Sequence, residues 1–245
     1  MARPRLTSLG LCLLLGFWSS AGFAACRQAL AIGLDISGSV DASEYRLQMD
    51  GLAAALLDSD VQDAFLAMPD AHVRLYIYEW GGYGTQRPLI PWTEVTDAAV
   101  LNLIANRLLA MVRRPHDPAT ALGRAMQYGG VALASQGDCW RLTLDLSGDG
   151  ESNIGPQPSD VKNAPFLWNI TINALVIGAD AAPFTDKRNS EIAELTAYFK
   201  AKVIRGPEAF VEAAIEFEEF QDAMSRKLLK ELQTMVVGAL ELPDQ

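Results

Sequence analysis

Runs of apolar residues alternate along the chain with segments in which apolar residues recur at helical spacing. Four apolar or β-branched runs predict buried strands, at 30–34, 73–80, 141–146 and 171–177. A shorter last strand is predicted at 202–204. Strands that alternate with helices form a mainly parallel sheet covered on both faces, so the pattern predicts one α/β domain.

Other segments have the spacing of helices that pack one face on a core. They comprise 45–56, 100–111, 119–133, 192–199 and a long amphipathic helix that starts at Glu208. Residues 87–92 follow a glycine-rich turn and are predicted to return as an antiparallel edge strand. Pro88 and Pro91 suit an edge, because proline cannot donate a hydrogen bond to a neighbouring strand.

Oxygen-bearing side chains gather where the predicted strands end and on one further loop. The stretch DISGS ends the first strand, DPATALG leads into a helix, and LSGDGESN ends a later strand. Together these loops contribute two carboxylates and three hydroxyls, from Asp35, Ser37, Ser39, Thr120 and Asp149. In open α/β folds ligands bind beside the carboxyl ends of strands. Oxygen ligands without His or Cys favour Mg²⁺, with Mn²⁺ or Ca²⁺ as alternatives, over zinc or copper.

Each of these residues has a simpler explanation when it is taken alone. Asp35, Ser39 or Thr120 could cap the helix that follows it, because short oxygen-bearing side chains are the preferred N-caps. A phosphate-binding loop would be rich in glycine and would contain a lysine. DISGS is not rich in glycine and contains no lysine. Three such motifs in order, each after the appropriate element, favour the metal site over separate caps.

The amino-terminal residues resemble a targeting segment. A basic start, an apolar stretch, and Gly22 and Ala24 at small-residue positions predict a signal peptide over 1–24, followed by a domain over 25–240. No later stretch is long enough to predict a transmembrane helix. The expected location is periplasmic or secreted. A lipoprotein anchored at Cys26 is an alternative, because residues 23–26 loosely resemble a lipobox.

The net charge bears on the possible partners of the protein, and the cysteines bear on its covalent structure. The net charge is −10, which disfavours binding to nucleic acid, since that requires a basic surface. Cys26 and Cys139 remain after removal of the signal peptide, and an even pair in an exported protein favours a disulfide.

The order and spacing of the three loops resemble those of von Willebrand factor A-type domains that have a metal-ion-dependent adhesion site. That family has Asp-x-Ser-x-Ser after the first strand, a Thr on a later loop and Asp-Gly after the fourth strand. The resemblance covers residues 28–235 and is strongest to a group of exported bacterial A domains. It implies a three-layer Rossmann-like fold with a long C-terminal helix. The chain departs from the pattern at residues 118–119, which are Pro-Ala where many members have Gly-Gly, and at Gly148, where many members have a residue with a hydroxyl.

The resemblance also implies roles for the candidate residues. Ser37 and Ser39 would bind the ion directly, Thr120 directly or through water, and Asp35 and Asp149 mainly through water. The function implied is a non-enzymatic module in which the ion binds a carboxylate of a protein partner. A metal-assisted hydrolase and a purely structural ion are the alternatives; a hydrolase would need a nucleophile or a general base near the ion.

In A-type domains the first and fourth strands are parallel neighbours. Cys26 lies nine residues before Asp35, and Cys139 lies ten before Asp149, so the resemblance places both cysteines at the opposite end of these strands. Adjacent strands are close enough for a disulfide. We therefore expect a Cys26–Cys139 bond, which would exclude lipidation of Cys26.

Overall fold

The computed structural model describes residues 25–178 and 186–239, with side chains described for 25–178 and 190–232. The predicted signal peptide, 1–24, lies outside the described residues. Six strands form one sheet in the order β3-β2-β1-β4-β5-β6. Their bounds are β1 Ala25–Asp35, β2 Ala71–Trp80, β3 Arg87–Val95, β4 Arg141–Gly148, β5 Ile170–Ile177 and β6 Val211–Ala214. All neighbours are parallel except β2 and β3, so the predicted antiparallel edge strand is confirmed.

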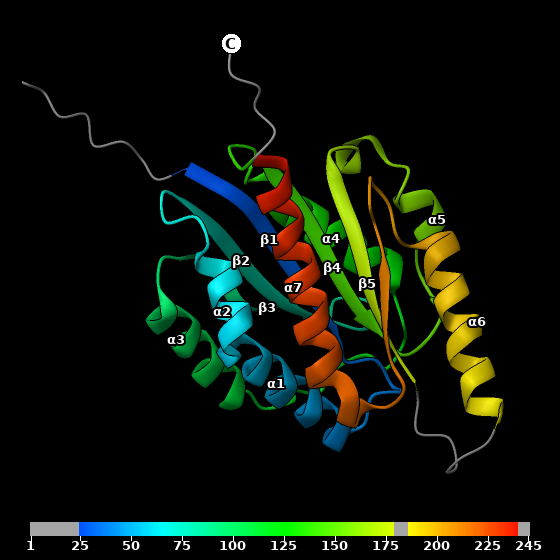
Figure 1. Ribbon diagram of the computed structural model, residues 1–245. Helices are drawn as coiled ribbons and strands as arrows, with labels where there is room; N and C mark the ends of the chain where they lie inside the picture. Colours follow the sequence, from blue (N-terminus) through cyan, green and yellow to red (C-terminus); the bar gives the residue numbers. More distant parts are fainter. Residues whose placement is uncertain (1–24, 179–185, 240–245) are drawn as a thin grey trace, which may run out of the picture.

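Helices cover both faces of the sheet, which confirms the α/β prediction (Figure 1). One face packs against α1 (Ala42–Leu57), α2 (Ser59–Leu66), α3 (Ala98–Leu109) and α7 (Phe220–Ala239). The other packs against α4 (Leu122–Ala134), α6 (Asp186–Lys202) and the short elements α5 (Pro158–Val161) and η1 (Pro165–Leu167). In the described part of the chain, none of the helices has the length and apolar character needed to cross a membrane.

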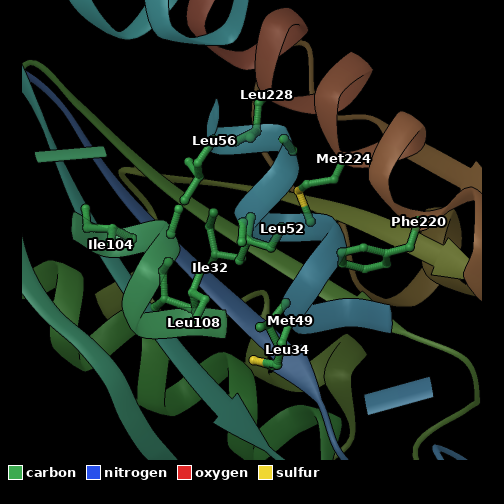
Figure 2. Close-up of a cluster of buried hydrophobic side chains, with 14 of the residues drawn as sticks. Ile32, Leu34, Met49, Leu52, Leu56, Ile104, Leu108, Phe220, Met224 and Leu228 are labelled. Atoms are coloured by element: carbon green, nitrogen blue, oxygen red, sulfur yellow. The ribbon is translucent and has the colours of Figure 1, made fainter. Parts of the chain in front are cut away.

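Figure 2 shows how the first face is packed. Ile32 and Leu34 of β1 lie under Leu52 and neighbouring apolar side chains of α1. From the flanking helices α3 and α7, further apolar side chains close the layer, among them Ile104, Leu108, Phe220, Met224 and Leu228. Apolar burial of this kind contributes about 25 cal/mol per Å² and holds the ends of the strands in a fixed relation.

Two predicted elements near the C-terminus are wrong. No strand forms at 202–204, because Lys202 is the last residue of α6. The sequence also predicts a helix that starts at Glu208. The chain instead forms β6 and then η2 (Phe217–Glu219), and the helix α7 starts at Phe220. β6 gains backbone hydrogen bonds by pairing with β5, which the periodicity of the local sequence does not reveal.

Cys26 and Cys139 form the expected disulfide, with Cα atoms 4.5 Å apart. Cys26 lies at the start of β1, and Cys139 precedes β4. Because β1 and β4 are parallel neighbours, the bond joins the sheet at the end opposite Asp35 and Asp149. It closes a sequence separation of 113 residues.

One face of the central strand β4 is polar although it is buried under helices. Thr143, Asp145 and Ser147 all lie on this face and are almost completely buried. Asp145 pairs with Lys227 of α7, whose Nζ lies 2.7 Å from Asp145 Oδ1 and 2.8 Å from Glu231 Oε1. A buried ammonium group between two carboxylates therefore joins α7 to the middle of the sheet.

Candidate metal centre

Four of the five residues proposed as ligands, all except Thr120, come together at the carboxyl ends of β1 and β4. The two strands are in register, with Gly33 opposite Leu146. Asp35 is the last residue of β1, and Asp149 follows directly after β4. In Figure 1 these strand ends lie at the bottom of the sheet, opposite the amino-terminal end of β1.

Four of the five residues are joined by a chain of hydrogen bonds that includes one backbone N–H. The backbone N–H of Ser37 donates to Asp35 Oδ1 at 2.7 Å. The hydroxyl oxygens of Ser37 and Ser39 are 3.1 Å apart, and Ser39 Oγ donates to Asp149 Oδ1 at 2.7 Å. The alternating serines of DISGS thus place both hydroxyls on the same side of the turn, toward the carboxylate of the second strand.

The two carboxylates are buried and leave oxygens without partners. Asp35 is fully buried and Asp149 is 8% exposed. In the described part of the chain, Oδ2 of each has no hydrogen-bond partner. Burial, and then the nearby Asp149 charge, raise the pKa of Asp35 well above its ordinary value, and burial raises the pKa of Asp149. A cation at this position would relieve both the desolvation and the repulsion.

Thr120 is positioned by its backbone beside the loop that follows Asp149. Its N–H donates to Asn153 Oδ1 at 2.9 Å, and its carbonyl accepts from the N–H of Asn153 at 3.0 Å. Its side chain is almost completely buried. The hydrogen bonds described above for the other four residues do not include the Thr120 hydroxyl, so its approach to the centre stays a prediction.

The helix-capping explanations are wrong for these residues. Asp41 caps α1, where its carboxylate accepts from the N–H groups of Ser43 and Glu44. The N-cap residue of α4 is Ala121, which makes no side-chain capping bond. Asp35, Ser39 and Thr120 are therefore not needed to start the helices that follow them.

Arg113 is a residue of this site that the sequence reasoning missed. Its Nη2 donates to the carbonyl of Val40, and it lies 3.2 Å from that of Ile36 and 3.3 Å from that of Ser37. One guanidinium group thus holds three carbonyls of the loop that contains the serines. Arg113 lies in the segment between α3 and α4, far from DISGS in sequence, and no motif marks it.

The same segment is tied to two other loops. Pro118 accepts a hydrogen bond from the N–H of Gly38 at 2.7 Å, and Asp117 accepts one from Gly82 at 3.1 Å. A Cβ at Gly38 would lie 2.9 Å from the Pro118 side chain, so this close approach requires glycine. The loop that departs from the family pattern at residues 118–119 is therefore hydrogen-bonded to two neighbouring loops.

The departure at Gly148 has a steric reason. A Cβ there would lie 3.1 Å from Phe199 Cζ and 3.5 Å from Asp35 Oδ2. The neighbouring Ser147 does not replace the missing hydroxyl at the centre, because its Oγ contacts Gly33 O and Gln48 Oε1 between the sheet and α1.

The donor set fits a hard divalent cation. It offers two carboxylates and two hydroxyls in hydrogen-bonded contact, and the two unpartnered carboxylate oxygens are available as acceptors. The described residues contain no group of three or more His, Cys, Asp and Glu side chains suited to a metal. The candidate site instead combines two carboxylates with serine hydroxyls.

Solved structures with the same fold are A-type domain proteins. A structure of proximal thread matrix protein 1 from the mussel byssus, described as having a zinc-occupied MIDAS motif, has TM-score 0.56 and 17% identity, covering 87% of this chain and 48% of the other. A von Willebrand factor type A protein from Catenulispora acidiphila has TM-score 0.54 and 18% identity, covering 85% and 43%. The pilus adhesin SpaC from Lactobacillus rhamnosus GG has TM-score 0.55 and 12% identity, covering 86% and 31%. The chain thus spans less than half the length of each of these proteins.

The sheet order and these similarities show that the chain has the fold of von Willebrand factor A-type domains. No curated protein is significantly similar to the chain in sequence. A family model matches residues 25–236, and the chain belongs to that family, described as "Protein of unknown function (DUF1194)".

Proposed function

We propose that this protein is an exported binding module in which a divalent cation, held by Asp35, Ser37, Ser39, Thr120 and Asp149, binds a carboxylate of a protein partner. The observation that carries the proposal is the pair of buried carboxylates at the end of the sheet, with the hydroxyls of Ser37 and Ser39 beside them. The two aspartates balance the charge of a divalent ion, and the hydroxyls add none. Such an ion takes six or more oxygen ligands, so the five side chains leave at least one position for a further oxygen. When bound, the ion would supply a local positive charge on an acidic protein.

The position of the site supports binding to a macromolecule. Gly38 and Ser39 are exposed, whereas Asp35 and Ser37 are buried beneath them. An ion between these residues would face solvent on one side and the end of the sheet on the other. The mussel structure with the zinc-occupied motif and the pilus adhesin have the same fold, which supports metal binding and adhesion as the kind of function to test.

Export is part of the proposal. We propose cleavage after Ala24, a domain over 25–240, and a periplasmic or secreted location. The disulfide supports an oxidising compartment, because such bonds are rare in the cytosol. Mass spectrometry of the protein purified from its source cells tests this, with Ala25 expected as the first residue. A chain that retains residues 1–24, or an acylated Cys26, would contradict it.

The first experiment measures binding of Mg²⁺, Mn²⁺ and Ca²⁺ to the wild-type protein, to Asp35→Asn and to Asp63→Asn, by calorimetry. Asp63 is a matched control, because it is exposed on α2 and undergoes the same chemical change. We expect one ion per chain in the wild type and in Asp63→Asn, and a loss of affinity in Asp35→Asn. Equal binding by all three proteins would refute the metal site.

The second experiment measures partner binding. Exported proteins of the source cells are passed over the immobilised domain with Mg²⁺ and again with chelator. The proposal expects partners that are retained only with Mg²⁺ and are lost with Asp35→Asn. Metal binding without metal-dependent capture would favour the structural ion, and metal-dependent turnover of phosphate esters would favour the hydrolase.

A further inference from the structure

A second candidate site lies at the opposite end of the sheet from the metal centre. A cavity of about 770 Å³ opens between the first residues of β4 and β5, the segment 207–210 and α7. In Figure 1 this is the upper end of the sheet, where β1 begins and the last turns of α7 lie. Its volume is in the range of pockets that hold small molecules.

The floor of this cavity is polar, although it is part of a buried sheet face. Gln28, Thr143 and Asn173 line it from the neighbouring strands β1, β4 and β5, and all three are almost completely buried. Elsewhere on this face the strands β1 and β5 present apolar side chains to the helices. Burying a polar group is costly unless it is hydrogen-bonded, so apolar packing does not explain a polar floor.

Most polar groups of the floor are hydrogen-bonded to neighbouring residues, and one polar atom is not. Gln28 Nε2 donates to Thr143 Oγ1 at 2.9 Å. Asn173 Nδ2 donates to Glu231 Oε1 at 2.8 Å, and Asn173 Oδ1 accepts from the N–H of Phe210 at 3.1 Å. Gln28 Oε1, by contrast, is buried and accepts no hydrogen bond from any described residue. A ligand with a hydroxyl or amino group could donate to it.

The mouth of the cavity is basic in a chain with a net charge of −10. Arg141, Arg226 and Lys230 line it, against the carboxylates of Glu208 and Glu231. Glu208 is only loosely paired with Arg141, since Arg141 Nη2 and Glu208 Oε2 are 3.9 Å apart. Arg226 is paired with Glu212, since Arg226 Nε and Glu212 Oε1 are 2.9 Å apart. Arg141 and Lys230 are therefore the cations that favour an anionic ligand.

The segment that frames the cavity also has an uncommon backbone and an apolar wall. Glu208 has φ of 58°, which is the left-handed region and is costly for a residue with a side chain. Phe210 lines the cavity, and Lys230 Nζ lies 3.8 Å from the centroid of its ring. A small hydrocarbon skeleton could pack beside this ring while its charged group contacts Arg141 and Lys230.

We propose that this cavity binds a small organic anion that also carries a hydroxyl or amino group, in the class of hydroxy-carboxylates and amino-carboxylates. The anionic group contacts Arg141 and Lys230, and the hydroxyl or amino group donates to Gln28 Oε1. The site does not depend on the metal centre, which lies at the other end of the sheet.

The test uses the whole mature protein and measures thermal shift and calorimetric binding. The probes are malate, lactate, serine and glutamate at millimolar concentration, with acetate as an anion that lacks the donor and glycerol as a donor that lacks the charge. At least one hydroxy- or amino-carboxylate is expected to bind about tenfold or more tightly than acetate and glycerol, because acetate cannot donate to Gln28 Oε1 and glycerol carries no charge. The absence of any such preference refutes the proposal.

Two variants locate the binding. The double variant Arg141→Gln and Lys230→Gln changes exposed or partly exposed side chains and is expected to lose about tenfold or more in affinity. Arg107→Gln is the matched control, because the Arg107 side chain is exposed on α3, and this variant should bind as the wild type does. Unchanged affinity in the double variant overturns the assignment. Chelator and Asp35→Asn should leave this binding unchanged, so failure of the metal site does not imply failure here.

Discussion

Replacement of Lys227 by Met tests the buried charge cluster that joins α7 to the sheet. Lys227 is fully buried, and its Nζ lies between Asp145 Oδ1 and Glu231 Oε1 at 2.7 and 2.8 Å. Methionine has a similar length but no charge, so the variant leaves two carboxylates buried without a cation. Removing one partner of a buried ion pair costs roughly 3–5 kcal/mol, and we expect a loss of this size at neutral pH.

The loss should depend on pH in a defined direction. Burial, and then the Glu231 carboxylate, raise the pKa of Asp145 to about 7 from its ordinary value of 3.8. Stability that the neutral carboxyl contributes is complete below the unfolded-state pKa and is lost as the pH rises through about 7. In the variant no ammonium group offsets the ionised form, so its deficit relative to the wild type should grow between about pH 5 and about pH 8.

The assay is urea unfolding, followed by circular dichroism, at both pH values. Arg226→Met is the control, because Arg226 is the neighbouring residue, is largely exposed and is paired with Glu212; the variant should lose less than about 1 kcal/mol. If Lys227→Met does not fold, the triple variant with Asp145→Asn and Glu231→Gln should restore folding, because no buried charge then remains. A deficit below about 1 kcal/mol near pH 8, or one that does not change with pH, would refute the reasoning.

Three further predictions concern the loops and the disulfide. Reduction of the disulfide should lower the free energy of unfolding by about 4–5 kcal/mol, by the chain-entropy relation for a long loop, and an unchanged urea midpoint would contradict it. Arg113→Gln should speed hydrogen exchange of the amides in 36–40 and cost about 1–3 kcal/mol, whereas Arg114→Gln, whose side chain is exposed, should change neither quantity. Gly123→Ala places a Cβ 2.0 Å from the Pro156 carbonyl oxygen and should cost about 1–3 kcal/mol in urea unfolding; Gly137→Ala, which meets nothing within 4 Å, is the neutral control.

The sequence by itself determined the class of fold and the candidate ligands. Apolar runs that are buried on both sides predict central parallel strands, and Pro88 correctly indicates the edge strand β3. The residues Asp35, Ser37, Ser39 and Asp149 could be found because each follows or lies near the end of a strand. In a parallel sheet the ends of neighbouring strands must lie at the same edge, so their proximity follows from local patterns.

The tertiary structure alone decided the position of β6 and the contacts that hold the site. Residues 211–213 are only partly buried, Ala214 is fully buried, and the stretch has no marked strand periodicity; it becomes a strand because β5 offers an edge for pairing. Arg113 meets the carbonyls of the serine loop, and Lys227 meets Asp145, across large separations in sequence. Such pairs depend on how helices pack on the sheet, and no local pattern of residues records that packing.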